Sequence, residues 1–191
     1  TGNQGTGKIT YEITSGNDVA SIDSATGTLT ILKAGDVTVK ATRAADDKYK
    51  EVTAEYTLTI NKADQTNFAF ENQNPGARTY KPRLTFENKA SSDQGADNVT
   101  YTITSDNGVA SIDDSNGTLT ILKAGTVTVK AVRAGDDCYN DSDEISYTLK
   151  INRADQTGFA FEKQNPGART YKPGLTFENK ATGNQGTGKI T

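Results

Sequence analysis

The chain has 191 residues, of which 33% are hydrophobic and 24% charged, and its net charge is -3. It contains no His, which excludes a Ser-His-Asp triad and metal sites built on imidazole. Its 21 basic and 24 acidic residues are mixed along the chain, so no basic stripe indicates a nucleic-acid partner. No apolar run approaches the roughly 20 residues that a membrane helix needs.

The sequence repeats itself. Residues 19–44, VASIDSATGTLTILKAGDVTVKATRA, return at 109–134 as VASIDDSNGTLTILKAGTVTVKAVRA. A second block, ADQTNFAFENQNPGARTYKPRLTFENKA at 63–90, returns with few changes at 154–181, and the decapeptide TGNQGTGKIT stands at both 1–10 and 182–191. The chain therefore consists of two copies of one unit plus an overlap.

Apolar and polar residues alternate through each unit, which predicts half-buried strands and no helix. In chain order the inward set is Ile9, Tyr11, Ile13, Leu29, Ile31, Val37, Val39, Tyr56, Leu58, Ile60, then Phe68, Phe70, Leu84, Phe86, then Val99, Tyr101, Ile103, Leu119, Ile121, Val127, Val129, Ala131, Tyr147, Leu149 and Ile151. Turn signals such as Asn74-Pro75-Gly76 and Ser115-Asn116-Gly117 separate the runs. Seven or eight short strands in a unit of about 90 residues predict an all-β, two-sheet antiparallel sandwich.

The string SDNGVASIDDSNGTLTILKAGTVTVKAVRAG at 105–135 resembles the bacterial Ig-like domains of the group 2 type. Their recurring pattern is a Val-Ala-x-[IV]-Asp strand, an Asn-Gly turn, a short strand, Lys-Ala-Gly and Thr-Val-Thr-Val. Such domains occur in tandem in intimin- and invasin-like surface adhesins. The resemblance implies tandem Ig-like sandwiches and an extracellular, stalk-like or adhesive role on a bacterial surface, but no particular binding site.

The frame of the repeat divides the chain into three parts. Residues 63–153 should form a complete Ig-like domain. Residues 1–62 carry the later strands of a domain and lack the first two, whereas 154–191 carry the first two strands and the start of the third. A sandwich that lacks strands exposes an apolar face and an unpaired edge, so each terminal part needs a partner.

The two terminal parts together would make one further sandwich. We expect Phe159, Phe161, Leu175 and Phe177 of one chain to pack against Ile9, Tyr11, Ile31 and Val39 of the next by strand addition. That contact is head-to-tail and does not close, so it predicts a filament of neighbouring copies. Closure within one chain is not expected, because the two parts should leave the central domain at opposite ends. The other interpretation is that the chain is a section of a longer tandem array.

On either interpretation the predicted function is structural and non-catalytic, a rod or fibre of end-to-end domains. The alternative is an adhesive module whose loops bind a glycan or a host protein, with Tyr49, Tyr80, Tyr139 and Tyr171 as the candidate stacking residues. No cofactor is expected.

Three further features are weaker candidates for sites. Asp136, Asp137 and Asp141 crowd one loop and are weak calcium candidates, because oxygen ligands suit calcium. The first copy opposes a cation there with Lys48 and Lys50. Gly2 to Lys8 has the spacing of a phosphate-binding loop, but Ile9 follows where that loop needs Ser or Thr. The lone Cys138 cannot form an internal disulfide, and the sequence assigns it no role.

Overall fold

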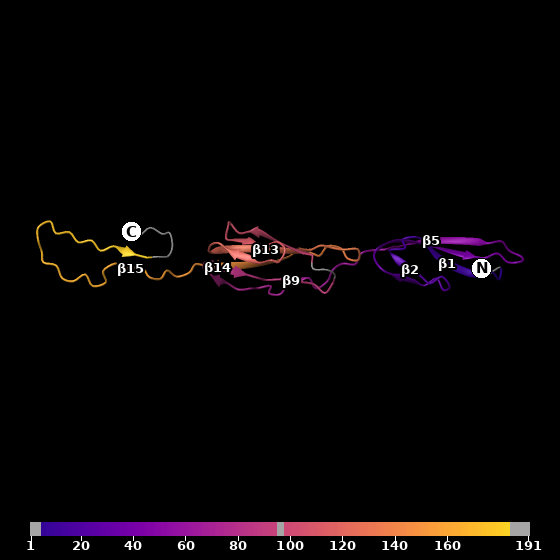
Figure 1. The fold of residues 1–191 in the computed structure, drawn as a ribbon, viewed down its shortest axis with the longest axis horizontal. Helices are drawn as coiled ribbons and strands as arrows, with labels where there is room; N and C mark the ends of the chain where they lie inside the picture. Colours follow the sequence, from indigo (N-terminus) through magenta and orange to yellow (C-terminus); the bar gives the residue numbers. More distant parts are fainter. Residues whose placement is uncertain (1–4, 95–97, 184–191) are drawn as a thin grey trace.

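The structure is a computed structural model that describes residues 5–94 and 98–183, and within these ranges it consists of strands and loops without a helix. Three parts lie in a row along the long axis (Figure 1). We call residues 5–62 the head, 63–153 the central domain and 154–183 the tail. Head and tail lie at opposite ends of the row, with the central domain between them.

The central domain contains two packed sheets. One has the order β10 (Val99–Ser105), β13 (Gly125–Arg133), β14 (Ile145–Asn152), β7 (Arg78–Thr79), and the other has the order β11 (Ala110–Ile112), β12 (Leu119–Ile121), β8 (Thr85–Phe86). The short strands β6 (Ala69–Phe70) and β9 (Ala90–Ser91) pair with each other. In β14 Tyr147, Leu149 and Ile151 are buried and alternate with exposed residues, which confirms the predicted alternation and the all-β sandwich.

One pairing between strands of the central domain is parallel, whereas a wholly antiparallel sandwich was expected. Strand β7 pairs with β14, and the two strands run in the same direction. Arg78 pairs with Ile151, and Thr79 pairs with Asn152. The chain enters the domain beside Tyr139 and travels its length before it reaches Arg78. The chain therefore runs parallel to β14 where the two pair. A strand of two residues is too short for alternation in the sequence to reveal its partner.

The head repeats the central architecture without its first segment. It has a sheet of β1 (Ile9–Ser15), β4 (Gly35–Arg43) and β5 (Val52–Ile60), and a hairpin of β2 (Ala20–Ile22) and β3 (Leu29–Ile31). Its strand register matches that of the central domain, down to the irregularity before Ser15 and before Ser105. Its buried hydrophobic core is small and comprises Val19, Ala20, Val37 and Val39.

The tail contains one pair of short strands, β15 (Ala160–Phe161) and β16 (Ala181–Thr182). No side chain of residues 154–183 is buried. The rest of the segment loops away from the central domain at the yellow end of Figure 1. This part of the chain therefore has secondary structure but no core.

Candidate assembly surfaces

The first segment of the central domain, residues 68–91, shows what a complete sandwich requires. It adds a strand to both sheets, since Phe86 pairs with Leu119 on one side and Arg78 pairs with Ile151 on the other. Backbone hydrogen bonds extend both contacts: the Ile121 amide donates to the Leu84 carbonyl at 2.9 Å, and the Tyr80 amide donates to the Asn152 carbonyl at 2.9 Å. The segment therefore covers two edges that are otherwise unpaired.

Aromatic side chains of the same segment fill the core. The Phe70 ring meets the Tyr147 ring edge-on at a centroid distance of 4.7 Å, and Phe86 approaches Tyr147 at 6.1 Å. The Tyr101 hydroxyl accepts a hydrogen bond from the Ala90 amide at 3.0 Å. Large aromatic rings in such contacts contribute strongly to core stability. Residues 68–91 are therefore an integral part of the central core.

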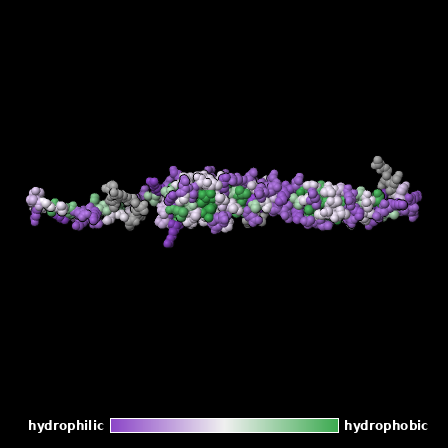
Figure 2. Space-filling view, turned by 90° about the horizontal axis from the view of Figure 1, so that it is seen from above, coloured by the Kyte–Doolittle hydropathy of each residue, from purple (hydrophilic) through white to green (hydrophobic). Residues whose placement is uncertain are grey.

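The head lacks this cover, and its equivalent side chains are exposed. Tyr56 is 51% exposed where the equivalent Tyr147 is 3% exposed, and Leu58 is 38% exposed where Leu149 is fully buried. Ile31 is likewise exposed, and apolar surface is visible on the head in Figure 2. We call Tyr11, Ile31, Tyr56 and Leu58 the acceptor face. Its flanking strands β3 and β5 pair on one side only, so both leave a free edge in the described structure.

The tail presents the matching surface. Phe161 is 58% exposed where its equivalent Phe70 is 5% exposed. Phe159, Leu175 and Phe177 are also exposed. We call residues 159–182 the donor segment. They repeat the sequence of the segment that completes the central domain, but in the described structure they do not pack on a partner sheet.

The donor segment already makes several of the local contacts that the central copy makes. Phe161 pairs with Ala181 just as Phe70 pairs with Ala90. The Asn179 side chain bridges the Lys163 amide and carbonyl at 2.9 and 2.8 Å, and the buried Asn88 makes the same two bonds to Asn72 at 3.0 and 2.8 Å.

A cation-π contact is repeated as well. The Arg169 guanidinium lies 5.2 Å from the centre of the Phe177 ring, the same distance that separates Arg78 from Phe86. The local contacts thus form without a partner sheet, and such preorganisation lowers the entropy cost of docking.

The side chains predicted to form the assembly interface are not brought together within one chain. Phe159, Phe161, Leu175 and Phe177 lie in the tail, whereas Ile9, Tyr11, Ile31 and Val39 lie in the head at the far end of the molecule (Figure 1). Of the head residues, Ile31 is exposed, Ile9 and Tyr11 are half-buried, and Val39 is only 1% exposed because the head itself covers it. Tyr56 and Leu58, which the structure leaves exposed, were not among the predicted interface residues. Their signal was the alternating Tyr-x-Leu-x-Ile run shared with Tyr147.

The candidate calcium carboxylates are engaged in the local structure. Asp136 accepts the Cys138 and Tyr139 amides at 2.7 and 2.9 Å, which lowers the pKa of its carboxyl. Asp141 accepts the Gly135 amide at 2.7 Å, and Asp137 lies 3.3 Å from the Lys33 ammonium. Within residues 5–94 and 98–183 no group of three acidic, Cys or His side chains is placed to bind a metal.

The loop that holds these carboxylates forms the joint between head and central domain. Across the joint, the Ala34 amide of the head donates to the Asp137 carbonyl at 3.1 Å. Beside it, at the start of the central domain, the Ala63 amide donates to the Cys138 carbonyl at 2.9 Å. The Cys138 thiol lies 3.9 Å from the Leu32 carbonyl. These contacts place Cys138 in the joint.

Other residues singled out in the sequence have varied positions. Tyr139, a candidate glycan-stacking residue, bridges to Ala63 at the joint and is half-buried, whereas Tyr171 is exposed. Residues 1–4 of the first decapeptide copy, including Gly2 of the phosphate-loop spacing, and residues 184–191 of the second copy lie outside the described structure. In the described part of the chain, no helix has the length and apolarity to cross a membrane.

Solved structures with a similar fold include the EC1–3 fragment of Drosophila N-cadherin, at 16% identity and a TM-score of 0.51, covering 83% of this chain and 58% of that one. Mouse cadherin-23 EC22–24 matches at 17% identity and a TM-score of 0.43, covering 81% of this chain and 57% of that one. At these identities the likeness concerns the fold alone, and the chain spans little more than half the length of these structures. The sequence of the chain matches no curated protein.

The sequence match to a domain family is direct. The family model of the bacterial Ig-like domain (group 2) matches residues 1–54 and again 81–136, which together are more than half of the chain. Both matched stretches contain the repeated strands whose register the head and the central domain share. The chain therefore belongs to the bacterial Ig-like domain (group 2) family.

Proposed function

We propose that this protein is a non-catalytic structural subunit of an extracellular rod or fibre on a bacterial surface. In this proposal residues 63–153 form one complete Ig-like domain. Residues 154–191 of one chain complete residues 1–62 of the next, so that chains join head-to-tail. Membership of the bacterial Ig-like family and the tandem arrangement support the structural, surface role.

The observation that carries the proposal is the paired exposure of the donor segment and the acceptor face. In the central domain the equivalents of these surfaces are packed against each other, as Phe70 against Tyr147. In the tail and the head the same side chains face solvent. Burying each large apolar side chain contributes about 1.5–3 kcal/mol, so both surfaces strongly favour a partner.

The partner we assign is a second copy of the chain. The acceptor face needs a Phe-x-Phe strand, a strand for the β5 edge and a strand for the β3 edge, and the donor segment supplies all three in the order that the central domain uses. Since head and tail lie at opposite ends, two paired chains still have one unpaired head at one end and one unpaired tail at the other. Repetition of this heterologous contact gives a filament.

Paired variants of the full chain test the proposal. Phe177→Asp places a charge in the donor segment and leaves the acceptor face intact, whereas Tyr56→Asp does the reverse. We expect wild-type protein to form longer species as its concentration rises in sedimentation velocity, and each variant alone to remain monomeric. Mixed together, the two variants should form only a one-to-one dimer, which we call the capped pair.

Val52→Asp is the matched control, because Val52 is exposed on β5 and the equivalent position of the central domain is already Asp143. This variant should assemble like wild type. A wild-type chain that stays monomeric at all concentrations would contradict the proposal, and so would two variants that fail to pair when mixed.

A further inference from the structure

The joint between head and central domain has two halves, and each half occurs a second time in the chain. One half is the turn with Leu32, Lys33 and Ala34, whose copy is Leu122, Lys123 and Ala124 at the tail end of the central domain. The other half is the loop 136–140, whose copy is the loop 46–50 at the free end of the head. Neither copy has a docking partner in the described structure.

Each copy has the local structure of the original. The Asp46 amide donates to the Tyr49 carbonyl at 2.9 Å, as Asp136 donates to Tyr139 at 3.0 Å. Asp46 also accepts hydrogen bonds from the Lys48 and Tyr49 amides, which repeats the turn at Asp136. The hydrogen bond from the Thr6 amide lowers the pKa of the Asp46 carboxyl most, and the Lys48 and Tyr49 amides lower it further.

The turn at Lys123 is equally similar to the turn at Lys33. The Leu122 and Lys123 amides donate to the Val109 carbonyl at 2.8 and 3.2 Å, and the Leu32 and Lys33 amides donate to Val19 at 2.8 and 3.3 Å. A copy of one half of this joint thus lies at the free end of the head, and a copy of the other half lies at the tail end of the central domain.

We infer that the joint forms again between chains. The loop 46–50 of the acceptor chain docks on the end of the donor chain's central domain, with Asp47 facing Lys123, and on the start of the donor chain's tail, with Lys50 facing Asp155. This inference rests on the proposed function, since head and tail must first combine. The inference adds to head-to-tail assembly a second, polar contact that sets how successive domains are oriented.

The first charge pair copies a contact within the chain. Asp137 and Lys33 are 3.3 Å apart at the existing joint, and their equivalents are Asp47 and Lys123. Lys33 also pairs with Asp18 at 3.0 Å, but the position equivalent to Asp18 is Gly108. Lys123 therefore lacks that local partner, and neither Lys123 nor Asp47 forms a salt bridge within the described residues.

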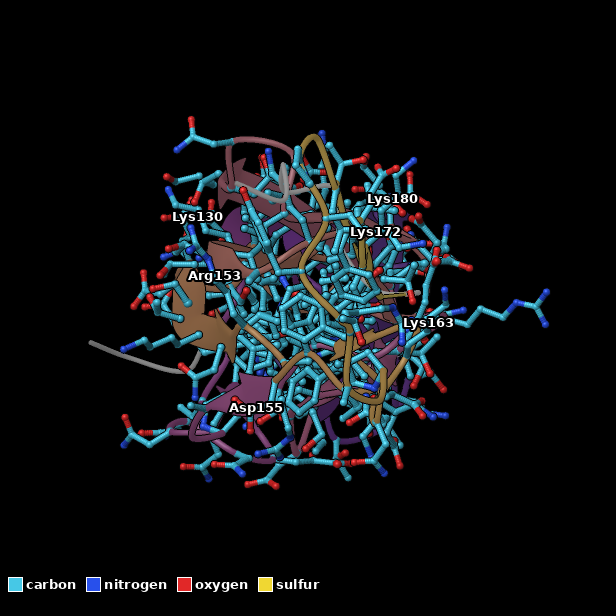
Figure 3. All side chains as sticks on the ribbon, turned by 90° about the vertical axis from the view of Figure 1, so that its left-hand side faces the viewer. Lys130, Arg153, Asp155, Lys163, Lys172 and Lys180 are labelled. Atoms are coloured by element: carbon cyan, nitrogen blue, oxygen red, sulfur yellow. The ribbon has the colours of Figure 1, made fainter. Side chains whose placement is uncertain are left out.

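The second pair replaces a hydrogen bond with an ion pair. The Asn140 amide group donates to the Asp64 carboxylate at 2.8 Å within the central domain, beside the existing joint. The equivalents are Lys50 and Asp155, which have opposite charges. Seen from the tail end, Asp155 lies apart from the tail residues Lys163, Lys172 and Lys180 (Figure 3). Charge complementarity of this kind favours the correct orientation of two surfaces.

Carbodiimide crosslinking of the full chain tests the contact. The reagent joins an amine to a carboxylate that is already in contact, and an equal mixture of unlabelled and nitrogen-15-labelled chains separates links between chains from links within one. We expect Lys123 to be linked to Asp47 in peptide pairs that combine both labels. Lys33 linked to Asp137, always within one label, is the internal control.

Charge reversal in the capped pair gives an independent readout. Lys123→Glu is placed on the chain with the working tail and Asp47→Lys on the chain with the working head. Either reversal alone should raise the dissociation constant about 3- to 10-fold at low salt, and both together should return it to within about 2-fold. Lys33→Glu, which alters only the joint within the chain, should leave the dissociation constant unchanged.

The outcomes separate the inference from the proposal on which it rests. A capped pair that forms, with the control link present but no mixed-label link and no effect of reversal, overturns the inference and leaves head-to-tail assembly standing. If no capped pair forms, head-to-tail assembly is contradicted and the inference falls with it.

Discussion

Tyr147 combines close packing with an unusual hydroxyl. Its ring is buried between Phe70 and Phe86, and its hydroxyl has no hydrogen-bond partner in the described structure. Burial raises the pKa of Tyr147 from 10.0 to about 12, because the phenolate would be poorly solvated. An unpaired buried hydroxyl costs stability that a phenyl ring would not.

Tyr147→Phe should therefore leave the central domain as stable as wild type at pH 7, or more stable by about 1 kcal/mol. The folded state retains the proton that the unfolded state loses near pH 10, so the wild-type domain should lose stability as pH rises from 10 to 12. The substitution removes the contribution of Tyr147 to that loss, because a phenyl ring has no proton to lose. Denaturant unfolding at pH 7 and pH 11 measures both effects. A loss at pH 7 well above 1 kcal/mol would show that the hydroxyl has a partner.

Gly117 is constrained both by its positive φ and by the neighbouring Tyr101 ring. Its φ is +74°, and a Cβ there would lie 2.8 Å from the Tyr101 ring. Gly76 has a φ of +67°, and a Cβ there would meet only the Arg78 side chain, at 3.9 Å. Gly76→Ala should cost about 1 kcal/mol from backbone strain, and Gly117→Ala at least about 1 kcal/mol more from the clash with Tyr101. Thermal unfolding of the two variants makes the comparison, and equal losses would contradict it.

At the scale of elements, one sequence segment occurs in two environments. Phe70→Ala should destabilise the central domain by about 3–5 kcal/mol, because it empties a packed site beside Tyr147. Phe161→Ala, the same change in the tail, should leave unfolding of the monomeric chain unaltered, since Phe161 is exposed. It should instead weaken assembly. Calorimetry on dilute protein and sedimentation on concentrated protein separate the two effects. A destabilised Phe161→Ala monomer would mean that the tail packs within its own chain.

The strands were predictable because burial on one face imposes a period of two, and β13 and β14 follow it through Val127, Val129, Tyr147 and Leu149. The glycine turns were predictable from their need for positive φ, as at Gly117. The parallel β7 pairing was not, because Arg78 and Thr79 are too short a strand to show a period.

The candidate interface was only partly predictable for a related reason. The sequence indicates that Val39 and Tyr56 both point inward, but it does not indicate which neighbour covers each. Val39 lies on the middle strand of the head sheet and is covered by the head itself, whereas Tyr56 lies on the edge strand β5 and is exposed. Strand order, which is a tertiary property, decides the difference.

For the whole molecule, the shared register of head and central domain predicts a uniform filament. A domain assembled from tail and head would have the strands of the central domain in the same order, so its length along the fibre should be the same. Electron micrographs should show one bead spacing without alternation between domains from one chain and domains from two. An alternating spacing would mean that the two kinds of domain are built differently.

The parallel pairing of β7 with β14 has a mechanical consequence. A pull along the rod draws residues 63–79 toward the head and β14 toward the tail, so the two paired segments must slide past each other. Sliding loads the contacts of Arg78, Thr79 and Tyr80 together, whereas peeling would break them one at a time. A domain shared by two chains would carry the same geometry at its own seam. Such a fibre resists stretching at its non-covalent seams by the same shear that protects its continuous domains.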